Sequence, residues 1–521
     1  MKPQMGDIPK EVEGLVKKLQ DAGFEAYPVG GCVRDLLLAR RSIDEGGRGE
    51  KPKDWDVTTS AKPEEILALF PESFYENKFL TVTVKTGAGD PTLAEIEITT
   101  FRAEGKYTDK RHPDEVRFAE TLEEDLGRRD FTVNAMAIRS IAHSAQHISQ
   151  EHSSRYALRA TGYEVIDPFG GRADIERKTI RAVGDPQKRF EEDALRMMRA
   201  VRLGVELGFR IDDATREAIR KHAGNLQFIA KERIRDELIK IIATPQAREG
   251  IELLHELGLL AYTIPELEQG IGVENRPRIF TIWEHNLKAL EYGAKTGFPV
   301  DVRIAALLHD VAKPATKGEM KRGEWTFYGH DVVGARMAAQ ILERLHFPRE
   351  TVEKIAKLIR WHLFKYDPDE GITDSSIRRL IRRVGAEQMN DLVKVRICDR
   401  MGMGVPKAVP YRLRHFQFRV EKILREEEAP TPKMLKIKGE DVMKILGIAP
   451  GPKVGHVLEV LLQEVIDNPE KNDRAHLESR IADLGKLPDE KLVQIAESSE
   501  SKIELAEDER VSEMKAKYYV K

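Results

Sequence analysis

The stretch that decides the fold is Tyr27-Pro28-Val29-Gly30-Gly31-Cys32-Val33-Arg34-Asp35, with Asp54-Trp55-Asp56 following it. Tyr27 to Val29 predicts a short apolar strand, the two glycines a tight turn, and Val33 to Ala39 a helix that starts at that turn. Backbone N–H groups at such a helix start can face a phosphate group. The turn is therefore a candidate phosphate-binding site.

The two aspartates supply the second half of the pattern. On an extended strand, residues two apart project to the same face, so we expect Asp54 and Asp56 to converge on hard cations, with Mg²⁺ as the cofactor. Two such metals clamp the attacking hydroxyl and the leaving pyrophosphate in nucleotidyl transfer. Asp-x-Asp and Gly-Gly are each common in ordinary loops, but their combination in this order favours a nucleotidyltransferase.

Length and composition favour a multidomain protein with ordinary cores. The chain has 521 residues, 41% of them hydrophobic, and we expect about two to four domains. No apolar run approaches the roughly 20 residues that span a bilayer, and Met1 to Lys10 lacks the apolar segment of a secretory signal. We therefore expect a cytoplasmic protein with no membrane association and no obligate protein partner.

Cysteine content excludes a disulfide-stabilised protein, and net charge gives no sign of a protein that binds nucleic acid over its whole surface. Cys32 and Cys398 cannot form a disulfide framework, so we expect both to be reduced. The net charge of -3 gives no global argument for nucleic-acid binding. Any surface for RNA must be regional.

Apolar spacing divides the chain into two kinds of structure. Residues 1 to about 140 mix short apolar strands with helical segments, and beyond about Asp185 the apolar residues recur mostly at helical spacing. We therefore predict an α+β protein with an α/β head and a helical body. Arg40 to Lys53 and Ile141 to Gly162 are expected to be surface insertions. The histidines of the second insertion predict a solvated loop better than a metal site; they are His143, His147 and His152.

The run from Glu192 to Arg202 predicts a helix that places Asp193 and Arg196 on one face. Asp193 can accept from an exocyclic amino group while Arg196 donates to the neighbouring ring nitrogen, a pattern that cytosine and adenine satisfy. Guanine and uracil present the opposite pattern, and a mismatched buried polar group costs about 1 to 3 kcal/mol. Arg199 and Arg202 extend the basic stripe and suit phosphates. The alternative is an ordinary surface ion pair.

Five motifs occur in order, and together they resemble class II CCA-adding tRNA nucleotidyltransferases. They are Gly30 to Asp35, Lys53 to Thr59, Arg128-Arg129-Asp130-Phe131-Thr132-Val133-Asn134-Ala135-Met136, Asp167-Pro168-Phe169-Gly170-Gly171 and Glu192 to Ala200. The resemblance implies a polymerase-beta-like head over 1–165, a helical neck that binds RNA over 166–275, an HD domain over 276–405, a tRNA-binding tail over 406–475 and a charged extension over 476–521.

The resemblance also implies roles for individual residues. Asp54 and Asp56 would hold Mg²⁺, and Glu97 would add a third carboxylate, or else pair with Arg102 at the surface. Nucleotide binding is implied for Gly31, Arg34, Arg129, Asn134, Asp193, Arg196, Arg199 and Arg202. The implied substrates are tRNA, CTP and ATP, and the implied reaction is attack of the tRNA 3' hydroxyl on the α-phosphate.

Relatives of this kind add all of CCA, only CC or only A, and bacterial poly(A) polymerases have the same head. The resemblance implies that enzymes adding only CC shorten a flexible loop, here Arg102 to Gly127, which is full length in this chain. Complete CCA addition is the expectation, with A addition or poly(A) synthesis as alternatives.

Histidines and aspartates in the body resemble the HD phosphohydrolase signature. Neutral imidazoles and carboxylates can hold a transition metal or Mg²⁺, and the adjacent His309 and Asp310 can reach it from one helix. The predicted ligands of Mg, Mn or Ni are His285, His309, Asp310 and Asp399, with His330 at a second metal or a phosphate. A competing hypothesis is a phosphohydrolase acting on RNA ends, whose head only captures RNA.

Regional basic faces could bind tRNA. The segments Ile377 to Arg383 and Tyr411 to Lys422 are basic, the second with Phe416 and Phe418 interleaved, and solvated helix faces are the equal alternative. Further on, Ile437 to Gly439 and Gly447 to Gly455 frame a turn before a helix and resemble the tRNA-binding tail. A third hypothesis, an RNA-binding adaptor without catalysis, is disfavoured by the aspartate pair.

Overall fold

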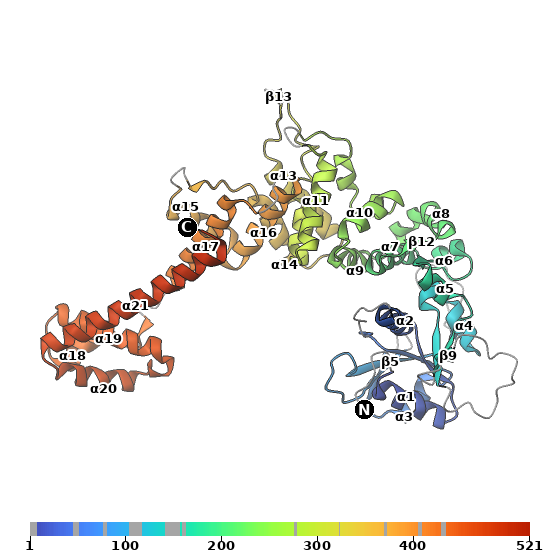
Figure 1. Ribbon diagram of the computed structural model, residues 1–521, viewed down its shortest axis with the longest axis horizontal. Coiled ribbons are helices and arrows are strands. Elements are labelled where there is room, and N and C mark those ends of the chain that lie inside the picture. Colours follow the sequence, from blue (N-terminus) through green and yellow to red (C-terminus); the bar gives the residue numbers. More distant parts are fainter. Residues whose placement is uncertain are drawn as a thin grey trace. The chain divides into compact units, whose positions relative to one another are not determined.

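The computed structural model describes residues 8–44, 52–76, 81–103, 117–140, 157–158, 163–275, 279–321, 324–368, 372–404, 409–428 and 434–520. The chain forms two units, Met1–Ala356 and Lys357–Lys521, and each is described by itself. A mixed sheet in the first unit and helices through the rest confirm the predicted α+β class (Figure 1).

The head is built on one eight-stranded sheet with the order β3-β4-β5-β2-β1-β8-β10-β9. β2 pairs with β5 in parallel and with β1 in antiparallel orientation. The strands are β1 (Ala26–Val29), β2 (Asp56–Thr59), β3 (Ser73–Glu76), β4 (Thr81–Lys85), β5 (Glu95–Thr100), β8 (Ala137–Ser140), β9 (Ala157–Leu158) and β10 (Tyr163–Ile166).

Alternation along the strands gives the sheet one packed face. In β5, Ile96 and Ile98 are buried while Glu95 and Glu97 are exposed, which is the period of two that a strand requires. Helices α1 (Lys10–Asp21) and α3 (Pro63–Leu69) pack against one side of the sheet, and α2 (Gly31–Asp44) lies on the other (Figure 1). The face of the central strands on the side of α2 is thereby left for the site.

Two predicted features of the head differ from the structure. The predicted surface insertion from Arg40 begins as helix, because α2 continues to Asp44. β2 begins at Asp56, so Asp54 precedes the strand that was expected to contain both aspartates. The rest of that insertion up to residue 51 and, apart from 157–158, the insertion from Ile141 to Gly162 with its three histidines lie outside the described residues.

The neck is helical, as predicted, and one of its expected helices is interrupted. It contains α5 (Gly171–Glu176), α6 (Pro186–Glu192), α7 (Leu195–Leu207), α8 (Asp213–His222), α9 (Lys231–Ala243) and α10 (Ala247–Glu256), with a short parallel pair, β11 (Thr179–Ile180) and β12 (Arg210–Ile211). The prediction of a continuous helix through Asp193 is wrong. Asp193 has extended angles, φ -142° and ψ 104°, because its carboxylate accepts the backbone N–H of Leu195 at the start of α7.

The first unit continues with α11 (Ile282–Lys295), α12 (Val300–Leu308), a hairpin of β13 (Met320–Lys321) and β14 (Glu324–Trp325), and α13 (His330–Arg344); α14 (Arg349–Trp361) follows. Thr281 caps α11 together with Glu284, which accepts the N–H of Thr281 in a capping box. The arrangement places His285 on the first turns of α11 and His309 directly after α12.

The second unit is helical where it is described. It contains α15 (Asp374–Val384), α16 (Met389–Gly402), α17 (Tyr411–Glu428), α18 (Gly439–Leu446), α19 (Pro452–Asp467), α20 (Arg474–Gly485) and α21 (Asp489–Tyr518). The tail core joins α18, α19, α20 and the start of α21. Leu477, Ile481 and Leu484 are buried in it, so packed residues continue past 475, where we expected the charged extension to begin.

The aromatic residues predicted to interleave with the basic face of α17 are in fact core residues. Phe416 and Phe418 have exposed fractions of 2% and 8%. Phe416 stacks on Phe364, and Phe418 packs against Met514 and Val520 of α21 and the residues after it. They are therefore placed for packing and not for stacking on bases. Among the described residues, no helix is both long and apolar enough to cross a lipid bilayer.

Candidate active site and candidate metal centre

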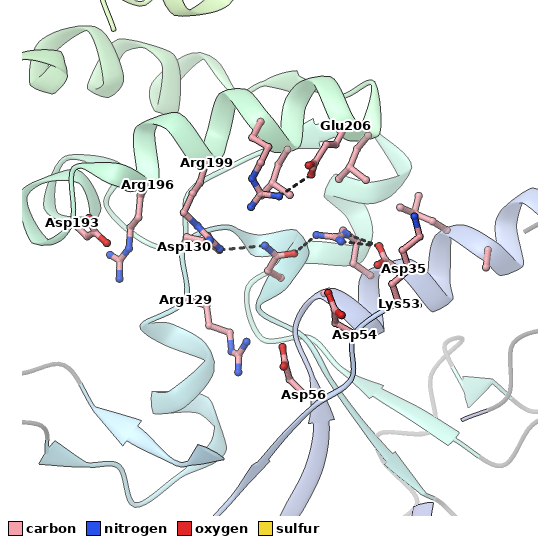
Figure 2. A pocket seen from close by; sticks show the side chains of 18 of the residues that line it. Asp35, Lys53, Asp54, Asp56, Arg129, Asp130, Asp193, Arg196, Arg199 and Glu206 are labelled. Carbon is pink, nitrogen blue, oxygen red and sulfur yellow. Dashed lines mark hydrogen bonds and ion pairs between the residues drawn. The ribbon is translucent and has the colours of Figure 1, made fainter. Parts of the chain in front are cut away.

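A cavity of about 990 Å³ lies between the head and the neck in the first unit (Figure 2). The cavity is lined by ten of the head and neck residues that the sequence predicted for catalysis and nucleotide binding: Gly31, Arg34, Asp54, Asp56, Arg129, Asn134, Asp193, Arg196, Arg199 and Arg202. Glu97, the predicted third carboxylate, is not among the lining residues. The cavity also includes residues that were given no role from the sequence, namely Asp35, Lys53, Arg128, Asp130, Glu206 and Arg233.

The carboxylates of Asp54 and Asp56 form the acidic end of the cavity. Burial raises the pKa of Asp56, the charge of Arg129 lowers it, and the nearby charge of Asp54 raises it again, for a net increase. A carboxylate whose pKa is raised by a neighbouring carboxylate fits a site for a divalent cation, which would relieve the repulsion between the two groups. Glu97 is the register partner of Asp56 on β5, so it faces the same side of the sheet.

The glycine turn and Arg129 lie against one another beside these carboxylates. Gly30 has a φ of +88°, and a Cβ atom there would lie 2.8 Å from Nη1 of Arg129. Helix α2 begins immediately afterwards, at Gly31, so its first N–H groups open at the cavity. The turn therefore requires glycine both for its backbone angle and for the close approach of a guanidinium.

Arg129 is bound by a buried carboxylate, that of Asp125. The Oδ2 atom of Asp125 lies 3.5 Å from Nη2 of Arg129, and its Oδ1 atom accepts from Arg128 at 2.9 Å. The same side chain accepts from the hydroxyl of Thr58 at 3.1 Å and from the backbone N–H of Arg102 at 3.1 Å. Burial alone would raise the pKa of Asp125, but the charges of Arg128 and Arg129 lower it. Asp125 thus links β2, through Thr58, to Arg129.

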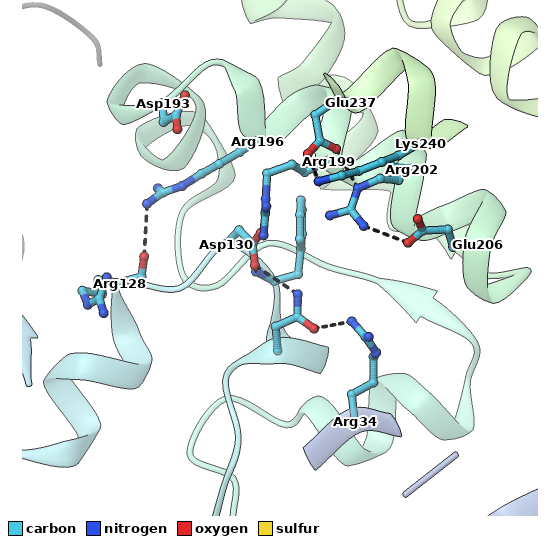
Figure 3. A network of polar contacts seen from close by, with 12 residues as sticks. Arg34, Arg128, Asp130, Asp193, Arg196, Arg199, Arg202, Glu206, Glu237 and Lys240 are labelled. Atoms are coloured by element: carbon cyan, nitrogen blue, oxygen red, sulfur yellow. Dashed lines mark hydrogen bonds and ion pairs between the residues drawn. The ribbon is translucent and has the colours of Figure 1, made fainter. Parts of the chain in front are cut away.

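A chain of hydrogen bonds crosses the cavity from head to neck (Figures 2 and 3). Arg34 donates to Oδ1 of Asn134 at 2.7 Å, and Nδ2 of Asn134 donates to Asp130 at 3.3 Å. Arg199 donates from Nε to Asp130 at 2.7 Å, and its Nη2 lies 2.6 Å from the same carboxylate. Burial alone would raise the pKa of Asp130, but Arg199 lowers it to about 2. Asp130 is therefore an ionised link between the two domains.

The predicted base-reading pair occupies the neck side of the cavity, with partners that the sequence did not indicate. Arg233 on α9 donates from Nη2 to Oδ2 of Asp193 at 2.8 Å. Arg196 donates to Oε2 of Glu192 at 2.5 Å and to the carbonyl of Arg128 at 3.1 Å (Figure 3). Nothing in the spacing of α9 shows that Arg233 contacts Asp193 between α6 and α7, because that contact joins residues 40 positions apart.

Arg202, the last residue of the predicted stripe, is bound by two carboxylates. Its Nε donates to Glu237 at 2.6 Å and its Nη1 donates to Glu206 at 2.8 Å (Figure 3). Glu237 is only 4% exposed, so this pair is buried. A phosphate that contacts Arg202 must share the guanidinium with both acids.

A second cluster of polar groups is buried in the first unit, around Asp310. Its Oδ2 atom lies 3.4 Å from Nε2 of His285 and 3.3 Å from Nε2 of His309, and these two nitrogens are 3.1 Å apart. The Oδ1 atom of Asp310 lies 3.3 Å from Nε2 of His330. Lys313 donates to the Oδ1 atom of Asn275 at 3.0 Å and lies 2.7 Å from Oδ2 of Asp310.

Two histidines of this cluster are oriented by backbone carbonyls. The Nδ1–H of His309 donates to the carbonyl of Ala306 at 2.7 Å, and the Nδ1–H of His330 donates to that of Phe327 at 2.6 Å. Each Nε2 therefore presents its lone pair to the cluster, which is the arrangement that metal-binding histidines need. The donor set fits a divalent metal. Asp399 lies on α16 in the second unit, where Arg396 binds it at 2.7 Å, and its place among the ligands stays a prediction.

Three family models match the chain. The poly(A) polymerase head domain matches residues 26–181, the "probable RNA and SrmB-binding site of polymerase A" matches 208–271, and the HD domain matches 283–403. The sheet, the carboxylate-lined cavity and these matches define a nucleotidyltransferase of the poly(A) polymerase type, followed by an HD domain.

Relatives that match over most of their length identify the family within that class. The chain is 35% identical over 84% of its length to an A-adding tRNA nucleotidyltransferase of Deinococcus radiodurans, covering 90% of that protein. It is 30% identical over 89% to a CCA-adding enzyme of a Geobacillus species, covering 94%, and 32% identical over 84% to a CC-adding tRNA nucleotidyltransferase of Thermus thermophilus, covering 89%. The chain belongs to the tRNA nucleotidyltransferase family.

One solved structure supports the fold across both units. It is the CCA-adding enzyme of Bacillus stearothermophilus in complex with CTP, which matches with a TM-score of 0.56 and 27% identity. The match covers 91% of this chain and 98% of that one. The family assignment therefore rests on sequence and on structure.

Proposed function

We propose that this protein adds CCA to the 3' end of tRNA from CTP and ATP without a nucleic-acid template. The observation that supports this best is the single cavity that brings Asp54 and Asp56 together with Asp193 and Arg196. One wall then has the carboxylates for group transfer, and the other has the groups that can select a base.

The head residues would bind the triphosphate. Asp54 and Asp56 would hold Mg²⁺, which supplies charge neutralisation at the phosphates and a lower pKa for the attacking hydroxyl when it is bound. Arg34 and Arg129 would contact phosphate oxygens, because both guanidinium groups line the cavity next to the start of α2. Asn134, between Arg34 and Asp130, is placed to contact the sugar.

The neck residues would choose the base. A carboxylate offers about four acceptor positions, and Asp193 uses its contacts with Leu195 and Arg233 to fix its direction. Its remaining capacity suits the exocyclic amino group of cytosine or adenine, and Arg196 suits the adjacent ring nitrogen. Uracil and guanine would set acceptor against acceptor, at a cost of about 1 to 3 kcal/mol.

Overall similarity does not choose between CCA, CC and A addition, because relatives of all three kinds match at 30% to 35% identity. The loop that the sequence associates with this choice runs from Arg102 to Gly127, and its residues 104–116 lie outside the described part of the chain. The full length of that loop in the sequence argues against addition of CC alone, and complete CCA addition is the expectation. A addition and poly(A) synthesis are the alternatives that the closing experiment separates.

We propose that RNA follows basic faces of the second unit and its tail. On α15 the residues Ile377, Ile381 and Val384 are buried, so the arginines between them face away from that core. Arg383 and Arg360 lie 5.1 Å and 4.6 Å from the ring of Trp361. A basic face with an aromatic ring suits an RNA backbone. In the tail, α19 begins after Gly451 and offers its N-terminal N–H groups to a phosphate.

Neutralising the carboxylates tests the transferase. Asp54→Asn and Asp56→Asn should each reduce CMP incorporation into tRNA by about a thousandfold or more, because the Mg²⁺ that would neutralise the phosphate charges loses a charged ligand. Glu95→Gln is the matched control, because this exposed carboxylate lies on β5 and is not among the residues that line the cavity. Incorporation at the wild-type rate by either aspartate variant would reject the proposal.

We propose a second activity, metal-dependent phosphohydrolysis, for the cluster around Asp310. The observation in its favour is the convergence of His285, His309 and Asp310, with the ring of His309 oriented by a backbone carbonyl. Mg, Mn or Ni would suit these ligands, with Asp399 as the further ligand that the sequence predicts. The substrate class would be a phosphomonoester or a 2',3'-cyclic phosphate.

Substitutions can separate the two proposed activities, nucleotidyl transfer and phosphohydrolysis. His309→Ala should abolish metal-stimulated hydrolysis of p-nitrophenyl phosphate and of a 2',3'-cyclic nucleotide, while CMP incorporation stays at the wild-type rate. His255→Ala is the control, because His255 is exposed and bound to Glu268 outside the cluster. No metal-stimulated hydrolysis by the wild-type protein would reject the second activity alone. Loss of CMP incorporation in His309→Ala, with Asp54→Asn unaffected, would reject the assignment of the transferase centre.

A further inference from the structure

A free ammonium group lies at the end of the cavity away from the base-selecting pair. Lys53 lines the cavity together with Asp35 and Asp54. Figure 2 shows Lys53 beside these two aspartates, whereas Asp193 and Arg196 lie at the other end. The side chain of Lys53 is exposed, and it has no hydrogen bond or ion pair with any residue that the structure describes. Its charge is therefore available to a ligand.

Buried residues on both sides place Lys53 and Asp54 at the cavity. Pro52 is buried, Trp55 is only 5% exposed, and β2 begins at the next residue, Asp56. Packing of these two apolar side chains fixes the backbone of the short segment between them. The ammonium group is therefore held next to the carboxylate that would bind Mg²⁺.

The arginines of the cavity are already engaged by acids of the protein. Each of them is bound by at least one carboxylate, so a phosphate that contacts it must share the guanidinium with that acid. These arginines are Arg34, Arg128, Arg129, Arg196, Arg199, Arg202 and Arg233. Of the described residues that line the cavity, only Lys53 is a cation without such a partner.

The start of α2 favours a phosphate at the same end. Gly31, the first residue of α2, lines the cavity with Arg34. A helix N-terminus has free N–H groups and a partial positive charge, both of which suit an anion. Asp35 would repel a phosphate, but Arg34 donates to its carboxylate at 2.8 Å and so offsets its charge.

We infer that Lys53 is a catalytic residue of nucleotidyl transfer, whose ammonium group binds the β- and γ-phosphates of the nucleotide and then the leaving pyrophosphate. The inference rests on the proposed function, in which Asp193 contacts the base and Arg34 contacts the triphosphate.

The charge of the leaving group gives Lys53 its role in the reaction. The 3' oxygen of the RNA forms a bond to the α-phosphorus, and its proton passes to water. The bond from that phosphorus to the oxygen that bridges the α- and β-phosphates breaks, and pyrophosphate leaves with the electron pair. An ammonium group placed at these oxygens stabilises the transition state, because their negative charge increases as the bond breaks.

Binding of pyrophosphate and of CMP tests the inference, because only the first would occupy the proposed subsite. The full-length protein is compared with Lys53→Gln, which removes the charge, and with Lys53→Arg, which keeps it. Lys85→Gln is the matched control, because Lys85 is an exposed lysine of β4 that does not line the cavity. Calorimetry measures the binding of each ligand, and single-turnover kinetics measure CMP incorporation into tRNA that ends before CCA.

Lys53→Gln should weaken the binding of pyrophosphate by about tenfold and slow CMP incorporation by about ten- to a hundredfold. The binding of CMP and the KM for tRNA should stay at their wild-type values. Lys53→Arg should retain most of the pyrophosphate binding and of the rate, and Lys85→Gln should match the wild type.

Wild-type pyrophosphate binding in Lys53→Gln would overturn the inference. A higher KM for tRNA with unchanged pyrophosphate binding would also overturn it, because Lys53 would then contact the RNA. Equal weakening of pyrophosphate and CMP would show a change in the shape of the cavity and would overturn it as well. A wild-type protein that incorporates no CMP into tRNA would instead reject the proposed function, and the inference with it.

Discussion

Arg233 on α9 binds Asp193 at the junction of α6 and α7, with 2.8 Å between Nη2 and Oδ2. The two residues lie 40 positions apart in the chain, and both line the cavity. The carboxylate that would accept a base's amino group is therefore aimed by a guanidinium from another helix.

Removing this guanidinium should loosen the base-selecting carboxylate. We expect Arg233→Ala to raise the KM for CTP and ATP by about tenfold, equivalent to about 1.4 kcal/mol, and to increase UMP incorporation relative to CMP. Steady-state kinetics with each nucleoside triphosphate measure this. Arg235→Ala is the control on the same helix, because Arg235 binds Asp236 and the carbonyl of His346. Unchanged selectivity in Arg233→Ala would contradict a positioning role.

The ion pair of Asp130 with Arg199 should make the stability of the first unit depend on pH. The pKa of Asp130 is lowered to about 2 from an ordinary 3.8, so its ionised form favours the folded state by about 2 kcal/mol. That contribution is complete above pH 4, the range of the unfolded carboxyl, and is lost as the pH falls towards 2.

Comparison with a neutral isostere measures this contribution. Asp130→Asn should lower the free energy of unfolding by about 2 kcal/mol at pH 7. The difference from the wild type should shrink between pH 4 and pH 2 in urea denaturation followed by fluorescence, which Trp55 in the head can report. A difference that stays constant over this pH range would show that the charge of Asp130 is not its cause.

Packing at the motif Asp167 to Gly171 gives a test of the fold itself. A Cβ atom on Gly171 would lie 2.2 Å from the carbonyl oxygen of Thr132, a backbone atom that cannot move aside. Gly171→Ala should therefore destabilise the head by about 1 to 3 kcal/mol. Gly14→Ala is the matched control on α1, where nothing lies within 4 Å, and it should stabilise by up to about 1 kcal/mol. Thermal unfolding of both variants would show midpoints shifted in opposite directions.

The sequence predicted the contents of the cavity more accurately than its geometry. Gly31, Arg34 and Asn134 belong to motifs whose order indicated one site, and the cavity includes all three. Helix periodicity did not show the break at Asp193, because capping of α7 by an aspartate carboxylate competes with a continued helix. Residue types alone also predicted that Asp54 lies on the strand, whereas β2 begins only at Asp56.

The residues that position the site could not be found from spacing. Asp130 and Glu237 are buried acids whose partners, Arg199 and Arg202, come from another element, and single-sequence patterns do not contain such contacts. On α17 the sequence pattern was misleading, because Phe416 and Phe418 lie among basic residues in the sequence but face the core. A helix with arginines on one face needs apolar residues on the other, and the sequence alone did not say which face met the solvent.

We propose that one cavity adds C, C and A in that order. The direct measurement gives the purified protein three tRNAs, ending before CCA, after C and after CC, with CTP and ATP supplied separately and together, and sequences the products. We expect that CTP alone extends the first two RNAs to CC and stops, that ATP alone extends only the third by one A, and that both nucleotides complete CCA on all three. Addition of A alone whatever is supplied, long A tails, or a stop at CC with ATP present would contradict it.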